Sequence, residues 1–307
     1  MKKPLSGIIP PMVTPLRDND TLDVAGLEKL IERILAGGVR GLFILGTTGE
    51  GPSLSYRLRG ELIERVCCQV RRRVPVLVGI TDTAFVESVN LARAAANSGA
   101  DALVLAPPYY MPEGQPELQE YLGHLVPQLP LPLYIYNMPA LTKVSFELDT
   151  VRRAMDNPRI IGLKDSSGSM TFFHQALGLL KHRPDWPVFM GPEEMLIDAV
   201  LAGGHGGVSG GANLFPKLYV KLVEAAQAGD LARARELHAH IMQVSGALYR
   251  IGRHSSSIIK GIKCALNCLG VCEDFMAEPF HRFRSGERQL VETRLAELKV
   301  AYDKLNL

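Results

Sequence analysis

The stretch VRGLFILGTTGEGPSLSYRLRGELIERVCCQVRRRVPVLVGI, residues 39–80, contains one unit of the pattern from which most of the chain is built. Its two ends, Val39–Gly46 and Pro75–Ile80, are short apolar runs with β-branched residues, which is typical of buried parallel strands. Between them, apolar residues follow the three-four spacing of an amphipathic helix: Leu58, Leu62, Ile63 and Val66. The stretch therefore predicts two parallel strands joined by a helix.

The same unit recurs along the chain about eight times, at a spacing of roughly 30 residues. The further strand-like runs are Gly7–Val13, Ala102–Ala106, Leu133–Asn137, Ile160–Lys164, Val188–Gly191 and Gly206–Ser209. An open doubly wound sheet would give similar local patterns, but no GxGxxG turn follows the first run, where Pro10 and Pro11 stand instead. We therefore predict an α/β fold, a closed (β/α)8 TIM barrel.

After Gly229 the alternation of strands and helices stops. Apolar residues then keep helical spacing from Leu231 to Ile251, and further helices are expected at about 257–269 and 287–305. We predict two parts: a catalytic barrel over residues 1–228 and a C-terminal helical region over residues 229–307.

Composition excludes several classes of protein. A chain of 307 residues with 47% hydrophobic residues can bury a large core without disulfides or metals. Its 34 Lys and Arg balance 32 Asp and Glu, so no basic field favours nucleic acid as a partner. No apolar run reaches the roughly 18 residues of a membrane span, and Pro10 and Pro11 interrupt what would be a signal peptide after Met1-Lys2-Lys3. We expect no membrane association.

Five cysteines are an odd number, which favours a reduced, cytoplasmic protein. Cys264, Cys268 and Cys272 are spaced by four residues and form a stripe on a helix. The stripe is compatible with a soft-metal site, but no CxxC pair or nearby His completes the ligands. A row of small buried thiols fits better.

In a TIM barrel, reactive side chains project from the carboxyl ends of the strands. The run Ile160–Lys164 ends on a lysine, and partial desolvation there would favour a neutral amine able to attack a carbonyl and form a Schiff base. The alternatives are a lysine paired with Asp165 or one that extends to solvent.

Hydroxyl groups follow other strands. Thr47 and Thr48 stand in a turn between glycines, which could bind a carboxylate or simply cap the next helix. Tyr134 and Tyr136 alternate onto one face of their strand, so one phenol could act as an acid and base inside the barrel, although tyrosines in strands are usually packing residues. Tyr110 follows a neighbouring strand at the same rim.

At these residues the sequence resembles the dihydrodipicolinate synthase/N-acetylneuraminate lyase superfamily of pyruvate-type class I aldolases. The matching segments are Gly46-Thr47-Thr48-Gly49-Glu50, Tyr136-Asn137-Met138-Pro139 and Ile161-Gly162-Leu163-Lys164-Asp165. The likeness covers nearly the whole chain.

The resemblance implies that Lys164 forms an imine with pyruvate or another 2-oxo acid. Thr47 and Thr48 would bind the carboxylate, and Tyr136 would be the general acid and base. Thr47 would connect Tyr136 to Tyr110 of a neighbouring subunit, within a homotetramer built as a dimer of dimers. No metal and no organic cofactor are implied.

The residues around the second substrate depart from the synthase pattern. Leu141 stands where synthases carry an arginine for the carboxylate of the aldehyde, and a leucine cannot make that contact. Gly191, Glu193 and Glu194 stand where sugar-cleaving relatives bind substrate hydroxyls, although the two acids could equally occupy the first turn of a helix. Val208 and Ser209, in a glycine-rich loop, would lie close to the imine.

These residues predict reversible aldol cleavage of a 2-keto-3-deoxy sugar acid to pyruvate and an aldehyde. The alternatives are condensation of pyruvate with aspartate semialdehyde, as in dihydrodipicolinate synthase, and dehydration of a sugar acid through the same imine. In the synthase alternative, Lys143 could bind the second carboxylate as a point charge; the other interpretation is a solvated lysine. A barrel that binds a ligand without turnover is the other class, and the set of Lys164, Tyr136 and Thr47 argues against it.

Overall fold

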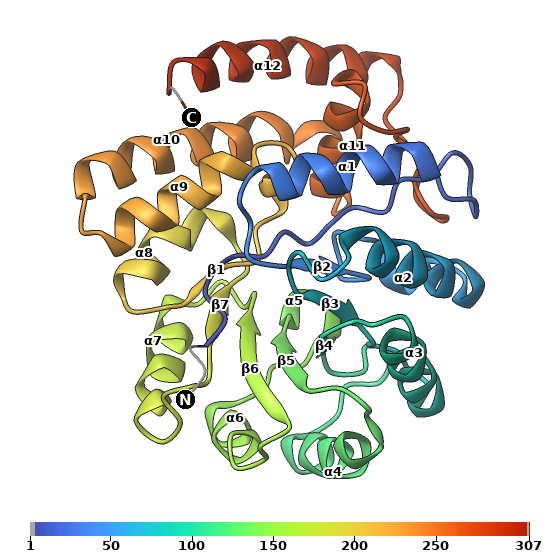
Figure 1. Cartoon of the computed structure of the whole chain (residues 1–307), viewed down its shortest axis with the longest axis vertical. Coiled ribbons are helices and arrows are strands. Elements are labelled where there is room, and N and C mark those ends of the chain that lie inside the picture. The colour runs from blue at the N-terminus through green and yellow to red at the C-terminus, as the bar shows by residue number, and fades with distance from the viewer. Residues whose placement is uncertain (1–3, 306) are drawn as a thin grey trace.

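The computed structural model describes residues 4–305 and 307, so the Met1-Lys2-Lys3 segment considered above as the start of a leader lies outside the described residues. Parallel strands form the centre of the molecule (Figure 1). In chain order they are β1 Gly7–Ile8, β2 Leu42–Ile44, β3 Val76–Gly79, β4 Ala102–Leu105, β5 Leu133–Asn137, β6 Ile160–Asp165, β7 Val188–Met190 and β8 Gly206–Gly207.

Hydrogen bonds close these strands into a barrel. The order is β1-β8-β7-β6-β5-β4-β3-β2, with every pair parallel. The segment after β1 completes the circle, because Met12 N donates to Phe43 O at 2.8 Å and Phe43 N donates to Pro10 O at 3.0 Å. The predicted (β/α)8 TIM barrel is therefore confirmed. β1 is shorter than expected because Pro10 and Pro11 have no N–H to continue a ladder.

Helices surround the strands. Around the barrel they are α1 Val24–Ala36, α2 Tyr56–Val70, α3 Phe85–Asn97, α4 Gln115–Leu125, α5 Pro139–Thr142, α6 Leu148–Ala154, α7 Met170–Gly178, α8 Leu196–Leu201 and α9 Pro216–Gln227. Three more follow: α10 Leu231–Leu248, α11 Ser257–Cys268 and α12 Ser285–Asp303. α10 packs against α9, and α12 packs against α10 and α11, so the C-terminal helices extend one side of the barrel (Figure 1).

The first helix illustrates how the sequence forms these elements. The side chain of Asp23 caps α1 by accepting a hydrogen bond from Gly26 N at 3.0 Å. One apolar face of α1 is buried: Leu27, Leu30, Ile31 and Ile34. The helix ends at Gly37 and Gly38, and Gly38 takes a positive φ of 79° that favours glycine.

Buried apolar residues form two layers. The larger layer lies between the strands and the helices. The smaller one fills the inside of the barrel, and its members are Ile9, Phe43, Leu77, Ala102, Val104, Ala106, Tyr134, Tyr136, Phe189 and Val208. Within residues 4–305, no helix combines the length and the apolar character needed to cross a membrane.

Candidate active site

Lys164 lies inside the barrel. Its neighbour Leu163 belongs to the outer apolar layer, so alternation along β6 directs Lys164 inward. Its Nζ is 3.9 Å from the centre of the Tyr136 ring and 5.0 Å from that of Phe43, both of which belong to the inner layer. Only 6% of Lys164 is exposed, so the lysine does not extend to solvent.

Lys164 is also not paired with Asp165. The carboxylate of Asp165 instead accepts hydrogen bonds from Asn137 Nδ2 at 3.0 Å and from the backbone and hydroxyl of Ser167. In the described part of the chain no carboxylate lies within 4.0 Å of the Lys164 amine. The site therefore contains a buried amine without an ion-pair partner among these residues.

Tyr136 is the group most closely associated with Lys164. Burial alone raises the pKa of its phenol, but the charge of Lys164 and hydrogen bonds with Ser166 and Thr47 outweigh burial and leave the pKa below its ordinary value. A phenol that interacts with both Thr47 and Lys164 links the turn after β2 to the amine. The structure thus brings Lys164, Tyr136 and Thr47 together. Tyr134 lies on the same face, as expected, and burial raises its pKa to about 12.

The turn that carries Thr47 and Thr48 follows β2 and is tightly folded. Leu45 and Glu50 both adopt positive φ angles, 58° and 56°, which are uncommon for residues other than glycine. A Cβ at Gly51 would lie 2.2 Å from the carbonyl oxygen of Leu45, so only glycine fits there. The half-buried Thr47 and Thr48 are therefore presented by a strained, closely packed backbone.

A buried ion pair connects this turn to the C-terminal helices. Glu50 Oε1 accepts from Lys263 Nζ on α11 at 2.7 Å, and Glu50 Oε2 accepts from Ala277 N at 2.8 Å. Both side chains of the pair are fully buried. Sequence reasoning missed Lys263, although a lysine between Ile262 and Cys264 in an apolar helix was a sign of a buried partner.

The ends of β7 and β8 supply small groups. Ser209 is fully buried, and its hydroxyl has no hydrogen-bond partner among the described residues. Val208 belongs to the inner apolar layer. A Cβ at Gly191 would lie 1.9 Å from Ser166 Oγ, so any other residue there would displace the Ser166 side chain. The side chain of His205, which the sequence places at the strand end, accepts from Val188 N at 3.2 Å.

The expectation for Glu193 needs correction. Its side chain is 4% exposed, and both carboxylate oxygens are bound within the protein: Gly211 N donates at 2.8 Å, and the hydroxyls of Tyr219 and Tyr249 donate at 2.5 and 2.7 Å. These contacts hold the carboxylate inside the protein. Burial raises the pKa of this acid to about 7, against the lowering effect of these hydrogen bonds.

Glu194 lies half-buried beside α10 and accepts a hydrogen bond from Ser245 Oγ. Both acids stand in the short helical turn Glu193–Met195 before α8, which is the alternative that the sequence left open. Glu193 is therefore bound inside the protein and Glu194 is bound to α10, so neither acid supports a polyhydroxylated substrate.

Three residues at the predicted rim are exposed. Leu141, on α5, is 48% exposed, and Lys143 follows at a positive φ of 62°. Tyr110 is 80% exposed in the loop after β4. The relay through Tyr110 stays a prediction.

The cysteine stripe carries no sign of a metal. Cys264 and Cys272 are buried and Cys268 is half-buried, and Cys272 lies beyond the end of α11. Among residues 4–305 no three His, Cys, Asp or Glu side chains gather as a metal ion would need.

Comparison with known proteins agrees with this geometry. Residues 4–298 match the model of the dihydrodipicolinate synthetase family. A solved structure of dihydrodipicolinate synthase from Bacteroides thetaiotaomicron is 54% identical and superposes with a TM-score of 0.94, covering 97% of this chain and 100% of the other.

Two proteins of Escherichia coli K12 are also similar. A probable 2-dehydro-3-deoxy-D-pentonate aldolase is 34% identical over 88% of this chain and 89% of its own length. A prophage protein of the dihydrodipicolinic acid synthase family, solved in complex with pyruvate, is 30% identical with a TM-score of 0.90, covering 96% of this chain and 98% of its own. The chain therefore belongs to the dihydrodipicolinate synthetase family and is a pyruvate-dependent aldolase or synthase, a class I lyase that uses a Schiff-base lysine.

Proposed function

We propose that Lys164 is the Schiff-base lysine. The observation that carries this proposal is the position of its amine inside the barrel, 3.9 Å from the Tyr136 ring centre and without a carboxylate partner among the described residues. The neutral amine attacks C2 of pyruvate and gives a carbinolamine, which loses water to form the imine. Thr47 and Thr48 bind the pyruvate carboxylate.

Tyr136 then moves protons in this sequence. It donates a proton to the departing hydroxyl of the carbinolamine. The Tyr136 phenolate then takes a proton from C3 of the imine, which gives an enamine. The enamine carbon attacks the carbonyl of an aldehyde to form the new carbon–carbon bond, and Tyr136 returns the proton to the aldehyde oxygen. Water releases the product and regenerates Lys164. Cleavage of a 2-keto-3-deoxy acid is the same path in reverse.

For the aldehyde, the comparisons favour aspartate semialdehyde, and we propose the synthase reaction first. The 54% identical relative is a dihydrodipicolinate synthase, and its likeness covers 97% of this chain. The sequence alone favoured sugar-acid cleavage over the synthase reaction. Glu193 no longer supports sugar-acid cleavage, because its carboxylate is bound inside the protein. Lys143 is the candidate for the carboxylate of the semialdehyde.

One observation favours sugar-acid cleavage as a second candidate. Leu141 offers no hydrogen bond to a carboxylate, and a pentonate aldolase is among the 34% identical relatives.

Borohydride trapping tests the chemistry. Wild-type protein treated with pyruvate and borohydride should gain the mass of one reduced imine, and peptide mapping should place it on Lys164. Lys164→Ala should gain nothing, whereas the exposed Lys217→Ala should behave like wild type. A wild-type mass gain in Lys164→Ala would contradict the assignment.

We also propose that the enzyme works as a homotetramer in which Tyr110 reaches a neighbouring site. The 80% exposure of Tyr110 leaves its ring free for such a contact. Tyr110→Phe should lower kcat while sedimentation shows an unchanged tetramer. A monomeric wild-type protein with full activity would rule the proposal out.

A further inference from the structure

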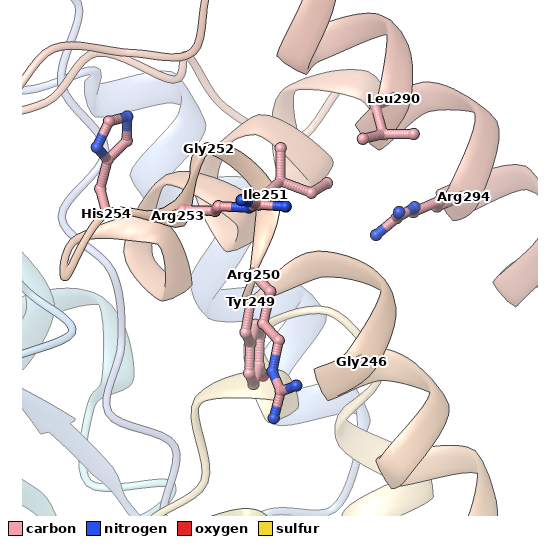
Figure 2. A pocket seen from close by; sticks show the side chains of 9 residues that line it. All are labelled: Gly246, Tyr249, Arg250, Ile251, Gly252, Arg253, His254, Leu290 and Arg294. Carbon is pink, nitrogen blue, oxygen red and sulfur yellow. The ribbon is translucent and has the colours of Figure 1, made fainter.

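A pocket of about 780 Å³ lies in the C-terminal helical region, between the end of α10, the turn η6 (Ile251–Arg253) and α12. Its walls include Tyr249, Arg250, Arg253, Leu290 and Arg294 (Figure 2). This volume falls within the range of about 300–1,000 Å³ that is usual for small-molecule sites. Neither the Lys164 site nor the proposed reaction uses this pocket.

Positive charge is concentrated in this pocket. Arg250, Arg253 and Arg294 line it, and none of the lining residues is acidic. In the described part of the chain none of the three guanidinium groups lies within 4.0 Å of a carboxylate. Arg294 Nη1 donates to the carbonyl of Ala247 at 2.7 Å, which orients the side chain without neutralising it. The chain as a whole carries only +2, so this grouping is not a reflection of a basic surface.

The geometry of the arginines suits a shared ligand. Figure 2 shows Arg253 from η6 and Arg294 from α12 extending toward each other from opposite sides of the pocket. Arg253 has a positive φ of 54°, directly after Gly252 at 77°. A residue other than glycine rarely holds this conformation, and such positions cluster at ligand sites.

One acid, Glu287, lies beside the lining residue His254 and is bound at the start of α12. Glu287 Oε1 lies 3.9 Å from His254 Nε2, and Glu287 Oε2 accepts from Arg284 N at the start of α12. Like charges that face one cavity repel unless an anion lies between them. We propose that this pocket binds a small anion with two or more negative charges, of the carboxylate or phosphate type.

Both ligand types suit the walls. A guanidinium group donates two parallel hydrogen bonds to a carboxylate or a phosphate, and two such groups on opposite sides can hold one anion. The Tyr249 ring forms one wall of the pocket and is held in place, because its hydroxyl donates a hydrogen bond to Glu193 Oε1 at 2.7 Å. Ile251 and Leu290 supply apolar contacts for a short carbon skeleton.

Calorimetric titration tests this site with two probes, citrate and inorganic phosphate, at an ionic strength matched with sodium chloride. The full-length wild-type protein should bind at least one probe saturably, with a dissociation constant at or below about 1 mM. Binding of citrate alone would identify a carboxylate site, and binding of phosphate alone a phosphate site. No saturable binding of either probe would overturn the proposal.

Variants separate this pocket from the Lys164 site. Arg253→Ala/Arg294→Ala should weaken binding about ten- to hundredfold, the cost of lost charged hydrogen bonds. The exposed Arg250→Ala should weaken it in the same direction with no risk to the fold, and the exposed Arg235→Ala on α10 is the matched control and should leave it unchanged. Unchanged binding in both pocket variants would refute the site. Lys164→Ala should retain anion binding, so failure of the proposed chemistry and failure of this proposal are distinguishable.

Discussion

Lys164 at the centre of the barrel and Lys263 at the junction with the C-terminal helices are both buried, yet their surroundings differ. Lys263 is 2.7 Å from the carboxylate of Glu50, whereas Lys164 faces the rings of Tyr136 and Phe43. An ion pair occupies the amine of a lysine. An amine without a carboxylate partner stays available to attack a carbonyl. Burial alone therefore does not make a lysine reactive; the partner decides its role.

The largest effect on turnover should come from replacing each of the two buried lysines by methionine in separate variants. Lys164→Met should reduce turnover to background, because the covalent step has no other nucleophile. Lys263→Met should still form the borohydride-stable adduct with pyruvate. Mass spectrometry of both trapped variants checks this contrast, and a label on Lys263 in the wild-type protein would reverse the interpretation.

The next effect concerns the phenol beside Lys164. Tyr136→Phe should fold normally and lose about 10²–10⁴ in kcat, since a proton-transfer group is deleted while the ring remains. Tyr134→Phe is the matched control, because it lies two residues away in the same inner layer. Steady-state kinetics of both variants provide the measurement. Equal kcat values in the two would make Tyr136 a packing residue.

The ion pair of Glu50 and Lys263 should contribute to stability and to the shape of the turn that carries Thr47 and Thr48. Lys263→Met leaves Glu50 buried without its cation, and we expect a loss of about 3–5 kcal/mol in the free energy of unfolding. The KM for pyruvate should rise because Thr47 and Thr48 are in the same turn as Glu50. Glu50→Gln/Lys263→Met should recover part of the stability in urea titrations.

The control for this experiment is Lys217→Met, an exposed lysine on α9 that should change stability little. If Lys263→Met costs less than about 1 kcal/mol, the pair behaves like a surface ion pair, and its proposed hold on the turn is refuted.

Two buried carboxylates extend the comparison. Glu50 has a lysine as its partner, whereas Glu193 has the hydroxyls of two tyrosines, and burial raises the pKa of Glu193 to about 7. The folded protein thus keeps a proton on Glu193 that the unfolded chain releases near pH 4.5. Its contribution to stability is complete below that pH and is lost as the pH rises to about 7.

Glu193→Gln imitates the protonated acid and should remove this pH dependence. Urea unfolding of the wild type and the variant at several pH values between 4 and 8 provides the measurement. The stability difference should change in favour of the variant as the pH rises. Parallel curves would show that Glu193 titrates alike in the folded and the unfolded chain.

These cases show what the sequence could predict. The position of Lys164 could be predicted, because a charged residue at the end of an apolar strand run breaks a local pattern. The ion pair of Lys263 and Glu50 could not be predicted, because the two residues are 213 positions apart and meet only when α11 docks on the barrel. The role of Glu193 was misjudged for the same reason, since Tyr219 and Tyr249 come from later helices. The barrel itself was predictable because its repeat is local, although strand lengths depended on Pro10 and Pro11.

The smallest effect concerns a third lysine, Lys143, which is exposed beside Leu141 at the rim. If aspartate semialdehyde is the second substrate, Lys143 binds its carboxylate as a point charge, and Lys143→Ala should lower kcat/KM for the condensation. A lost charged hydrogen bond costs roughly 1.5–3 kcal/mol, or about one to two decades. Leu141→Arg should act in the opposite direction by adding a bidentate donor.

The deciding measurement compares two values of kcat/KM, one for condensation of pyruvate with aspartate semialdehyde and one for cleavage of several 2-keto-3-deoxy acids. Both are measured in the wild type, Lys143→Ala and Leu141→Arg. Lys217→Ala serves as the control for loss of an exposed positive charge. Faster condensation in the wild type, with a selective loss in Lys143→Ala, supports the synthase reaction. Faster cleavage, unaffected by Lys143→Ala, would instead show that an apolar Leu141 suits an aldehyde without a carboxylate, and the exposed lysine would then be a solvated surface residue.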